Sequence, residues 1–465
     1  MKMTVCPSNR TEWNRLWACA VFGSVDFPDA RLGRRAALLL AQQAERPGDS
    51  LAQAAGDAAA AKGNYRLLEN DRVTAKHFWE PIHAHTAKRL VRCKRVVCIQ
   101  DTTTLMFPGL AATTGLGTMG TEREEALLMH TALAVRVDGQ VLGLLHNDVW
   151  ARPPEQFKKS HRRKSRPIEE KESYKWIRGM RAVTELRDRH SGATKLLHVF
   201  DREGDVHEVL QEVIDQGGDG VIRCHYDRNV DGPYGHVRAT LGACPVLTSC
   251  RIDVPRKKGQ RKRQAAIEVR SAQLTLTPAR IYPDRKPLCI NAVWVHELDP
   301  PEGLDPLDWV LLTTLPVATA AQCNDVIETY KLRWLIEDFH RVLKGGCQIE
   351  KTQLKTAERI EELLALLSAI AARLLELRQW ARTEPDAPCT EVLSEDEWRV
   401  LLAYTRKRPL AGGLSPPTMR EAVRMIGRLG GHLGRKGDGM PGVKTLWQGW
   451  RDLQILVEGY HVSLR

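Results

Sequence analysis

The stretch YKLRWLIEDFHRVLK, residues 330–344, combines a helical period with an unusual set of charges. At about 100° of rotation per residue, its apolar side chains gather on one side of a helix. Four other side chains fall on the opposite side, within a stripe roughly 60° wide: Tyr330, Arg333, Glu337 and Lys344. We therefore predict a single helix from about residue 320 to the paired glycines at 345–346. Its expected core face is Leu332, Leu335, Ile336, Phe339, Val342 and Leu343.

A simpler interpretation is a surface helix in which Arg333 and Glu337 form an ordinary i,i+4 ion pair, stabilising it by a few tenths of a kcal/mol. Two other acids favour a functional interpretation. Asp101 and Asp201 each end a short apolar run, RVVCIQD and KLLHVFD, that is typical of a buried strand. Three carboxylates on two strand ends and one late helix are what a pair of divalent metal ions needs to act on phosphodiesters.

The charge and composition of the chain indicate its partner and compartment. Its 465 residues carry a formal net charge of +12, which favours a polyanionic partner. The 11 cysteines form no CxxC pair and no zinc-type cluster, so we expect reduced thiols. The N-terminus lacks the apolar segment of a secretory signal. The longest apolar run, residues 363–372, is shorter than the roughly 18 residues of a spanning helix. These features predict a soluble cytoplasmic protein that does not enter a membrane.

Residues 1–90 are predicted to form an N-terminal helical DNA-binding domain. An Ala/Leu-rich helix should stop at residues 47–48, and a second should run from near Ser50 through YRLLEN. A small basic helical module can read DNA, whereas a solvated helix start is the simpler interpretation of its arginines. The candidate DNA contacts in this domain are Arg31, Arg34, Arg35, Tyr65 and Arg66.

Residues 91–385 are predicted to form an α/β catalytic domain with a ribonuclease H-like sheet. Three antiparallel strands should come first, followed by alternating helices and strands. Short strands over about residues 230–315 predict a β insertion with a basic hairpin tip, although a solvated hairpin would carry the same charges. Residues 158–166, KKSHRRKSR, form a further basic loop.

Residues 386–465 follow a Pro-containing linker and are predicted to be helical. This C-terminal region is a candidate dimerisation region. Its Trp447 and Trp450 could lie in a core or in a protein interface, and the sequence favours a core.

The spacing Y-x2-R-x3-E-x6-K, placed after two strand-end aspartates, resembles the signature of the insertion-sequence-four family of DDE transposases. The resemblance extends over most of the chain, through segments such as GNYRLLEN, IQDTTTL, LLHNDVWARP, EEKESYKW, FDREGDVHEVL and PLDWVLLTTLPV.

This resemblance implies a role for each candidate residue. Asp101, Asp201 and Glu337 would be a catalytic triad that binds two Mg²⁺ ions, with Mn²⁺ able to substitute. The DNA end would be held by Tyr330, Arg333 and Lys344, with a further candidate contact from Arg223. Trp309 would stack on a flipped base, although a buried core tryptophan is its simpler interpretation.

The function implied is cut-and-paste DNA transposition. A homodimer would bind paired transposon ends in double-stranded DNA, cleave them through a hairpin intermediate and join the 3′ ends to target DNA. We expect a cytoplasmic, nucleoid-associated enzyme. The alternatives are a metal-dependent nuclease without strand transfer and a DNA-binding regulator without catalysis. Intact carboxylates argue against the regulator.

Overall fold

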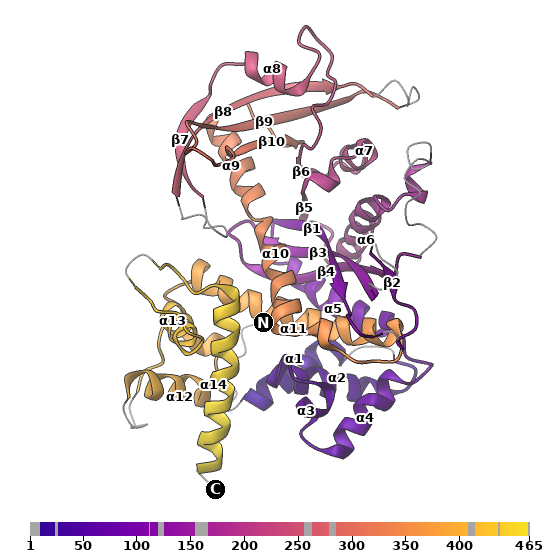
Figure 1. Ribbon diagram of the computed structural model, residues 1–465, viewed down its shortest axis with the longest axis vertical. Coiled ribbons are helices and arrows are strands. Elements are labelled where there is room, and N and C mark those ends of the chain that lie inside the picture. Colours follow the sequence, from indigo (N-terminus) through magenta and orange to yellow (C-terminus); the bar gives the residue numbers. More distant parts are fainter. Residues whose placement is uncertain are drawn as a thin grey trace.

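The computed structural model describes residues 10–23, 27–110, 112–119, 125–153, 166–254, 263–278, 285–407, 414–435 and 438–463. A large mixed sheet carries helices on both faces, with helical groups at the two ends of the chain (Figure 1). Among the described residues, no helix combines the length and the apolar character needed to cross a membrane.

The sheet contains ten strands in the order β2-β3-β1-β5-β6-β10-β9-β8-β7, with β4 paired to β3. Strands β1, β3 and β4 are antiparallel neighbours, whereas β5 and β6 run parallel to β1. The predicted order of three antiparallel strands followed by alternating helices and strands is confirmed. The strands are β1 (Arg95–Met106), β2 (Gly117–Thr118), β3 (Glu125–Arg136), β4 (Val141–Trp150), β5 (Lys195–Phe200), β6 (Asp219–Arg223), β7 (Thr248–Val254), β8 (Arg263–Leu276), β9 (Leu288–Leu298) and β10 (Asp308–Thr313).

Helices between the strands cover one face of the sheet. Strand residues of even number in β1, such as Val96 and Cys98, face this side because side chains alternate along a strand. The covering helices are α6 (Tyr174–His190), α7 (His207–Asp215) and α8 (Val237–Ala243).

The predicted β insertion continues the main sheet instead of forming a separate unit. Strand β8 pairs antiparallel with both β7 and β9. Strand β10 pairs antiparallel with β9 on one side and with β6 on the other, and so connects these strands to the rest of the sheet. The predicted basic hairpin tip, at residues 255–262, and almost all of the basic loop at 158–166 lie outside the described residues.

The N-terminal region is helical, as predicted, with one difference. The helix expected from Ser50 through YRLLEN is two helices, because Gly56 adopts the left-handed conformation with φ of +81°. Asp57 then starts the next helix by accepting a hydrogen bond from the Ala60 amide at 2.8 Å. The helices are α1 (Arg10–Phe22), α2 (Ala30–Glu45), α3 (Leu51–Ala55), α4 (Ala58–Leu68) and α5 (Ala75–Leu90).

The single helix predicted over the Tyr330 stretch is also divided. It consists of α9 (Ala320–Lys331), α10 (Trp334–Arg341) and a π-helical turn (Val342–Gly346). Between α9 and α10, the amides of residues 332 and 333 donate to carbonyls three residues earlier, so the chain tightens to a 3₁₀-type turn. In a regular helix, Tyr330 and Ile336 would lie about 120° apart. Both are buried, and the tighter turn lets both enter the core.

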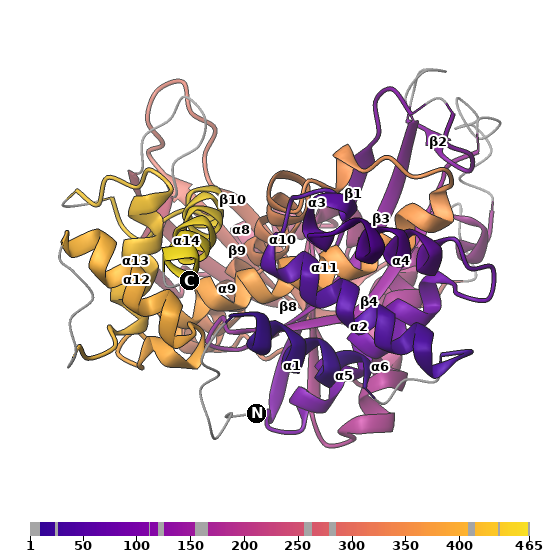
Figure 2. The same ribbon diagram turned by 90° about the horizontal axis from the view of Figure 1, so that it is seen from below.

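The last helices are α11 (Ala357–Thr383), α12 (Glu395–Arg406), α13 (Met419–Leu429) and α14 (Val443–Ser463). Helices α12, α13 and α14 pack around their own apolar cluster and gather at one side of the molecule, away from α2–α4 (Figure 2). Trp450 is buried in this cluster, and Trp447 is buried against Gly346. The preference for a core position of both tryptophans is therefore confirmed.

Candidate active site

Two neighbouring strands bring Asp101 and Asp201 together. Strands β1 and β5 are paired in parallel up to the pair Ile99 and Val199, and each aspartate lies two residues further along its strand direction. Asp101 was expected to end its strand. However, β1 continues to Met106 because β3 remains its partner there. Asp101 therefore lies where β1 has lost one of its two neighbours, at the open edge of the parallel pair.

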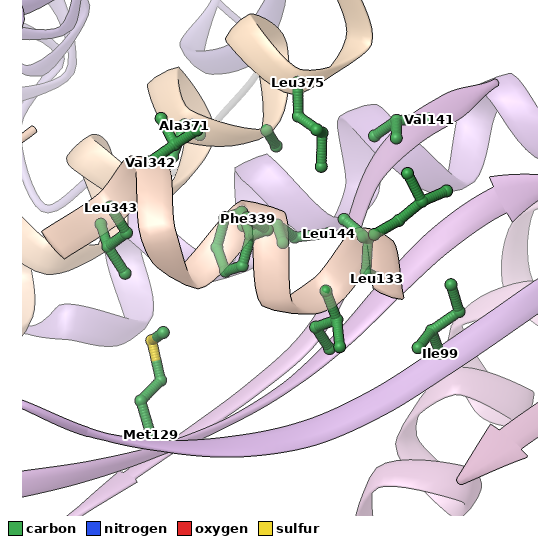
Figure 3. Close-up of a cluster of buried hydrophobic side chains, with 14 of the residues drawn as sticks. Ile99, Met129, Leu133, Val141, Leu144, Phe339, Val342, Leu343, Ala371 and Leu375 are labelled. Atoms are coloured by element: carbon green, nitrogen blue, oxygen red, sulfur yellow. The ribbon is translucent and has the colours of Figure 1, made fainter. Parts of the chain in front are cut away.

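Both aspartates face the side of the sheet on which α10 packs. Ile99 and Val199 belong to the core on this side, and the alternation of side chains gives Asp101 and Asp201 the same direction. Figure 3 shows Phe339 of α10 above the sheet, close to Leu133 of β3 and Leu144 of β4. The apolar face of α10 thereby holds its polar residue Glu337 near the two aspartates.

Arg333 lies between the carboxylates of this site. Its guanidinium donates a hydrogen bond to Glu337 Oε1 at 2.5 Å, and its Nη1 is 3.9 Å from Asp101 Oδ2. The side chain is only 9% exposed, and the guanidinium lies 4.9 Å from the centre of the Trp334 ring. Its Nε is buried without a hydrogen-bond partner. Arg333 therefore places positive charge beside both Asp101 and Glu337.

The aspartates are poorly compensated even so. Burial, followed by the charge of Asp201, raises the pKa of Asp101 to about 7. Burial also raises the pKa of Asp201, although the hydrogen bond that its carboxylate accepts from the Glu203 amide at 2.8 Å opposes this rise. Burial therefore outweighs the opposing charge of Arg333 at both aspartates.

These residues fit divalent cations by their chemistry. Carboxylate oxygens are the ligands that Mg²⁺ prefers, and Mg²⁺ commonly uses one or two carboxylates together with substrate phosphates. Among the residues that the structure describes, no three His, Cys, Asp or Glu side chains lie close enough to hold one ion as they stand. The Arg333 guanidinium contacts both Asp101 and Glu337.

Tyr330, Trp309 and Arg223 lie together beside the carboxylates. The Trp309 ring meets the Tyr330 ring edge-on, with centroids 5.5 Å apart. Arg223 donates to the Asp308 carbonyl at 3.2 Å, and it also interacts with the Tyr330 hydroxyl. Tyr330 was expected opposite the core face, but it is only 2% exposed because the turn before α10 directs it inward. Trp309 is half-buried at the edge of the core.

Lys344 extends from the π-helical turn to the far part of β1. Its ammonium donates to the Thr104 carbonyl at 2.5 Å and lies 3.9 Å from Glu350. Glu350 also accepts a hydrogen bond from the Met106 amide at 2.9 Å. The turn is thereby fixed against β1, three residues beyond Asp101.

The N-terminal candidates lie apart from this site. Figure 1 shows α2 and α4 below α11, whereas the sheet lies above it. Arg31 is paired with Asp29, and the Arg35 guanidinium packs over Gly63 of α4. Arg34, Tyr65 and Arg66 are exposed.

Sequence reasoning missed Lys175. Its side chain is only 7% exposed, and its ammonium lies 3.3 Å from Glu203, two residues after Asp201. Its positive charge opposes the rise in the pKa of Asp201. The segment EEKESYKW contains this lysine, but periodicity does not indicate that it faces the aspartates.

Comparison with known protein families gives three matches along the chain. Residues 14–73 match a transposase DNA-binding family, residues 158–374 a transposase DDE domain, and residues 369–464 a Tn5 transposase dimerisation domain. With the carboxylate site, these matches define a DNA-binding DDE transposase that has a dimerisation domain.

More particularly, the chain is a Tn5-like DDE transposase. A DDE domain implies a ribonuclease H-like core and the use of divalent metal. The segment that matches the DDE domain contains Asp201 and Glu337 but begins after Asp101. In the structure, the parallel register of β1 and β5 places Asp101 beside Asp201.

Proposed function

We propose that this chain is a cut-and-paste transposase whose catalytic acids are Asp101, Asp201 and Glu337. The observation that carries this proposal is that the buried guanidinium of Arg333 contacts both Asp101 and Glu337, while the parallel register of β1 and β5 sets Asp201 beside Asp101. In this proposal the three acids hold two Mg²⁺ ions, with Mn²⁺ as a substitute. When bound, such ions lower the pKa of an attacking water and stabilise the charge on a leaving oxygen.

In this proposal, three basic residues of the chain bind phosphates of the DNA end. Arg333 passes from Glu337 to a phosphate of the DNA end, which frees Glu337 as a ligand and clamps the DNA. Lys344 exchanges the Thr104 carbonyl for a second phosphate, and Arg223 provides a third basic contact near Tyr330. For Lys344 the exchange is favourable because a phosphate carries a full negative charge and the Thr104 carbonyl does not.

Trp309 and Tyr330 serve the hairpin step of the proposed reaction. A hairpin forms when a freed 3′ hydroxyl attacks the opposite strand, and this sharp bend requires a base to leave the stack. Half-buried Trp309 supplies a replacement stacking surface, which contributes roughly 1 to 3 kcal/mol per base.

The division into domains follows the same proposal. Residues 1–90 bind double-stranded transposon DNA through Arg31, Arg34, Arg35, Tyr65 and Arg66, and residues 91–385 form the ribonuclease H-like catalytic domain with its β insertion. Residues 386–465 support a homodimer on paired ends.

The test combines purified protein, Mg²⁺ and duplex DNA with the flanking terminal repeats. Excised DNA with hairpin ends, followed by joined products, is the expected result. Cleavage without joining would mean a nuclease. Binding without cleavage, with Mg²⁺ or Mn²⁺, would mean a regulator.

A further inference from the structure

Helix α13 carries a stripe of arginines that the catalytic proposal does not use. Arg420, Arg424 and Arg428 are all exposed and follow one another at four-residue intervals. A rise of 1.5 Å per residue places successive Cα atoms about 6 Å apart along one side of the helix. Among the residues that the structure describes, no carboxylate forms an ion pair with any of the three.

The one acid of α13 is engaged elsewhere. Glu421 is the acid of α13, and it accepts hydrogen bonds from the Thr418 amide and hydroxyl at 2.9 and 3.2 Å to cap the helix. Like charges at i,i+4 spacing destabilise a helix by a few tenths of a kcal/mol per pair. The helix therefore bears two like-charge pairs, Arg420 with Arg424 and Arg424 with Arg428, and among the described residues none of these arginines forms an ion pair.

The opposite face of α13 fixes the direction of these arginines. Met419, Ala422, Val423 and Ile426 are each about 1% exposed, within the apolar cluster shared with α14. Helices α13 and α14 also approach each other very closely. A Cβ atom added to Gly449 of α14 would lie 1.7 Å from the Ile426 carbonyl oxygen of α13. Figures 1 and 2 both show α13 on the outer side of α14, so the stripe faces away from the molecule.

We propose that Arg420, Arg424 and Arg428 bind the sugar–phosphate backbone of duplex DNA without reading its sequence. One strand carries a phosphate every 3.4 Å along the duplex axis, so a row about 12 Å long spans several phosphates. Guanidinium groups suit phosphate oxygens through paired hydrogen bonds. The bound DNA is either the donor duplex beyond the transposon end or the target duplex, which share this chemistry.

The test measures how the affinity of the full-length protein for labelled duplex DNA changes with salt, in buffer without divalent metal. The variant replaces the three arginines together: R420Q, R424Q and R428Q. Each phosphate contact adds about 0.9 to the slope of log affinity against log salt. We therefore expect the variant to bind more weakly, with a slope reduced by about 2 to 3.

The matched control removes the same charge from arginines that already have acidic partners. Arg181, Arg187 and Arg189 of α6 are paired with Glu212, Asp188 and Glu185. Their triple glutamine variant should keep the wild-type slope. Equal loss of slope in both variants would overturn the proposal, because net charge alone would then explain the effect.

Two further measurements separate DNA contact from a structural role. Melting of the α13 variant should occur at the same or a higher temperature than wild type, since a repulsion is removed. The matching triple lysine variant should restore most of the slope. An unchanged slope combined with an altered oligomeric state in sedimentation would overturn the proposal and indicate a protein contact.

Comparing two kinds of duplex shows whether the arginines of α13 contact donor or target DNA. Weaker binding only to terminal-repeat DNA that continues beyond the transposon end indicates donor DNA. Weaker binding to unrelated duplex as well indicates target DNA. Unchanged slopes on every duplex would contradict any DNA contact by this stripe.

Discussion

Arg333 donates a 2.5 Å hydrogen bond to Glu337 while its other terminal nitrogen lies 3.9 Å from Asp101. One guanidinium is thus shared by two of the acids that are proposed to hold metal ions. The side chain is held by burial and by the Trp334 ring, so it is an ordered part of the site. We infer that metal and Arg333 compete for these acids until DNA draws the guanidinium away.

The competition predicts that Arg333→Gln increases metal affinity in the absence of DNA. A hydrogen bond between charged groups contributes about 1.5 to 3 kcal/mol, so Mn²⁺ should bind about tenfold or more tightly. Titration calorimetry measures this directly. Arg341→Gln is the control, since Arg341 is paired with Asp338 on the same helix and not with the carboxylate site. Unchanged or weaker Mn²⁺ binding by Arg333→Gln would refute the competition.

Loss of the proposed end-holding residues should separate the first cut from hairpin formation. We expect Trp309→Ala and Arg333→Ala to nick the DNA but to accumulate nicked ends, because the base and its phosphate are no longer held. Denaturing gels resolve the species, since a hairpin migrates as one strand of doubled length. Hairpins formed as fast as in wild type would mean that these residues serve only the fold.

The packing of α10 on the sheet predicts a large stability effect at Phe339. This side chain is fully buried between the sheet and the late helices, as Figure 3 shows. Phe339→Ala should lower the free energy of unfolding by about 3 to 5 kcal/mol through lost burial and a residual cavity. Denaturant unfolding of the purified protein measures the change. Val137→Ala, at a residue that is 62% exposed, should change it by less than about 0.5 kcal/mol.

Local patterns in the sequence account for much of the fold and for the choice of the three acids. Apolar runs predicted the strands that carry Asp101 and Asp201, because buried strands need continuous apolar side chains. The parallel register that sets the aspartates side by side joins residues 100 positions apart, and no local pattern encodes it.

The same limit explains the corrected features of the late helix. Helical period placed Tyr330 opposite the core, yet the turn at residues 332–333 directs it inward toward Trp309. Lys175 was missed for a similar reason, since its contact with Glu203 depends on how α6 packs beside β5. The individual roles of all the candidate site residues, the three acids included, stay predictions.

Cleavage by Asp101→Asn tests the central claim most directly, because Asp101 lies outside the matched DDE segment and is assigned to the site only by the sheet register and its contact with Arg333. The substitution keeps the shape of the side chain and removes its charge, while the proposed DNA contacts stay intact. With terminal-repeat duplex and Mg²⁺, we expect the cleavage rate to fall by about three orders of magnitude or more, with DNA affinity near that of wild type. Cleavage at the wild-type rate would remove Asp101 from the catalytic site and contradict the account.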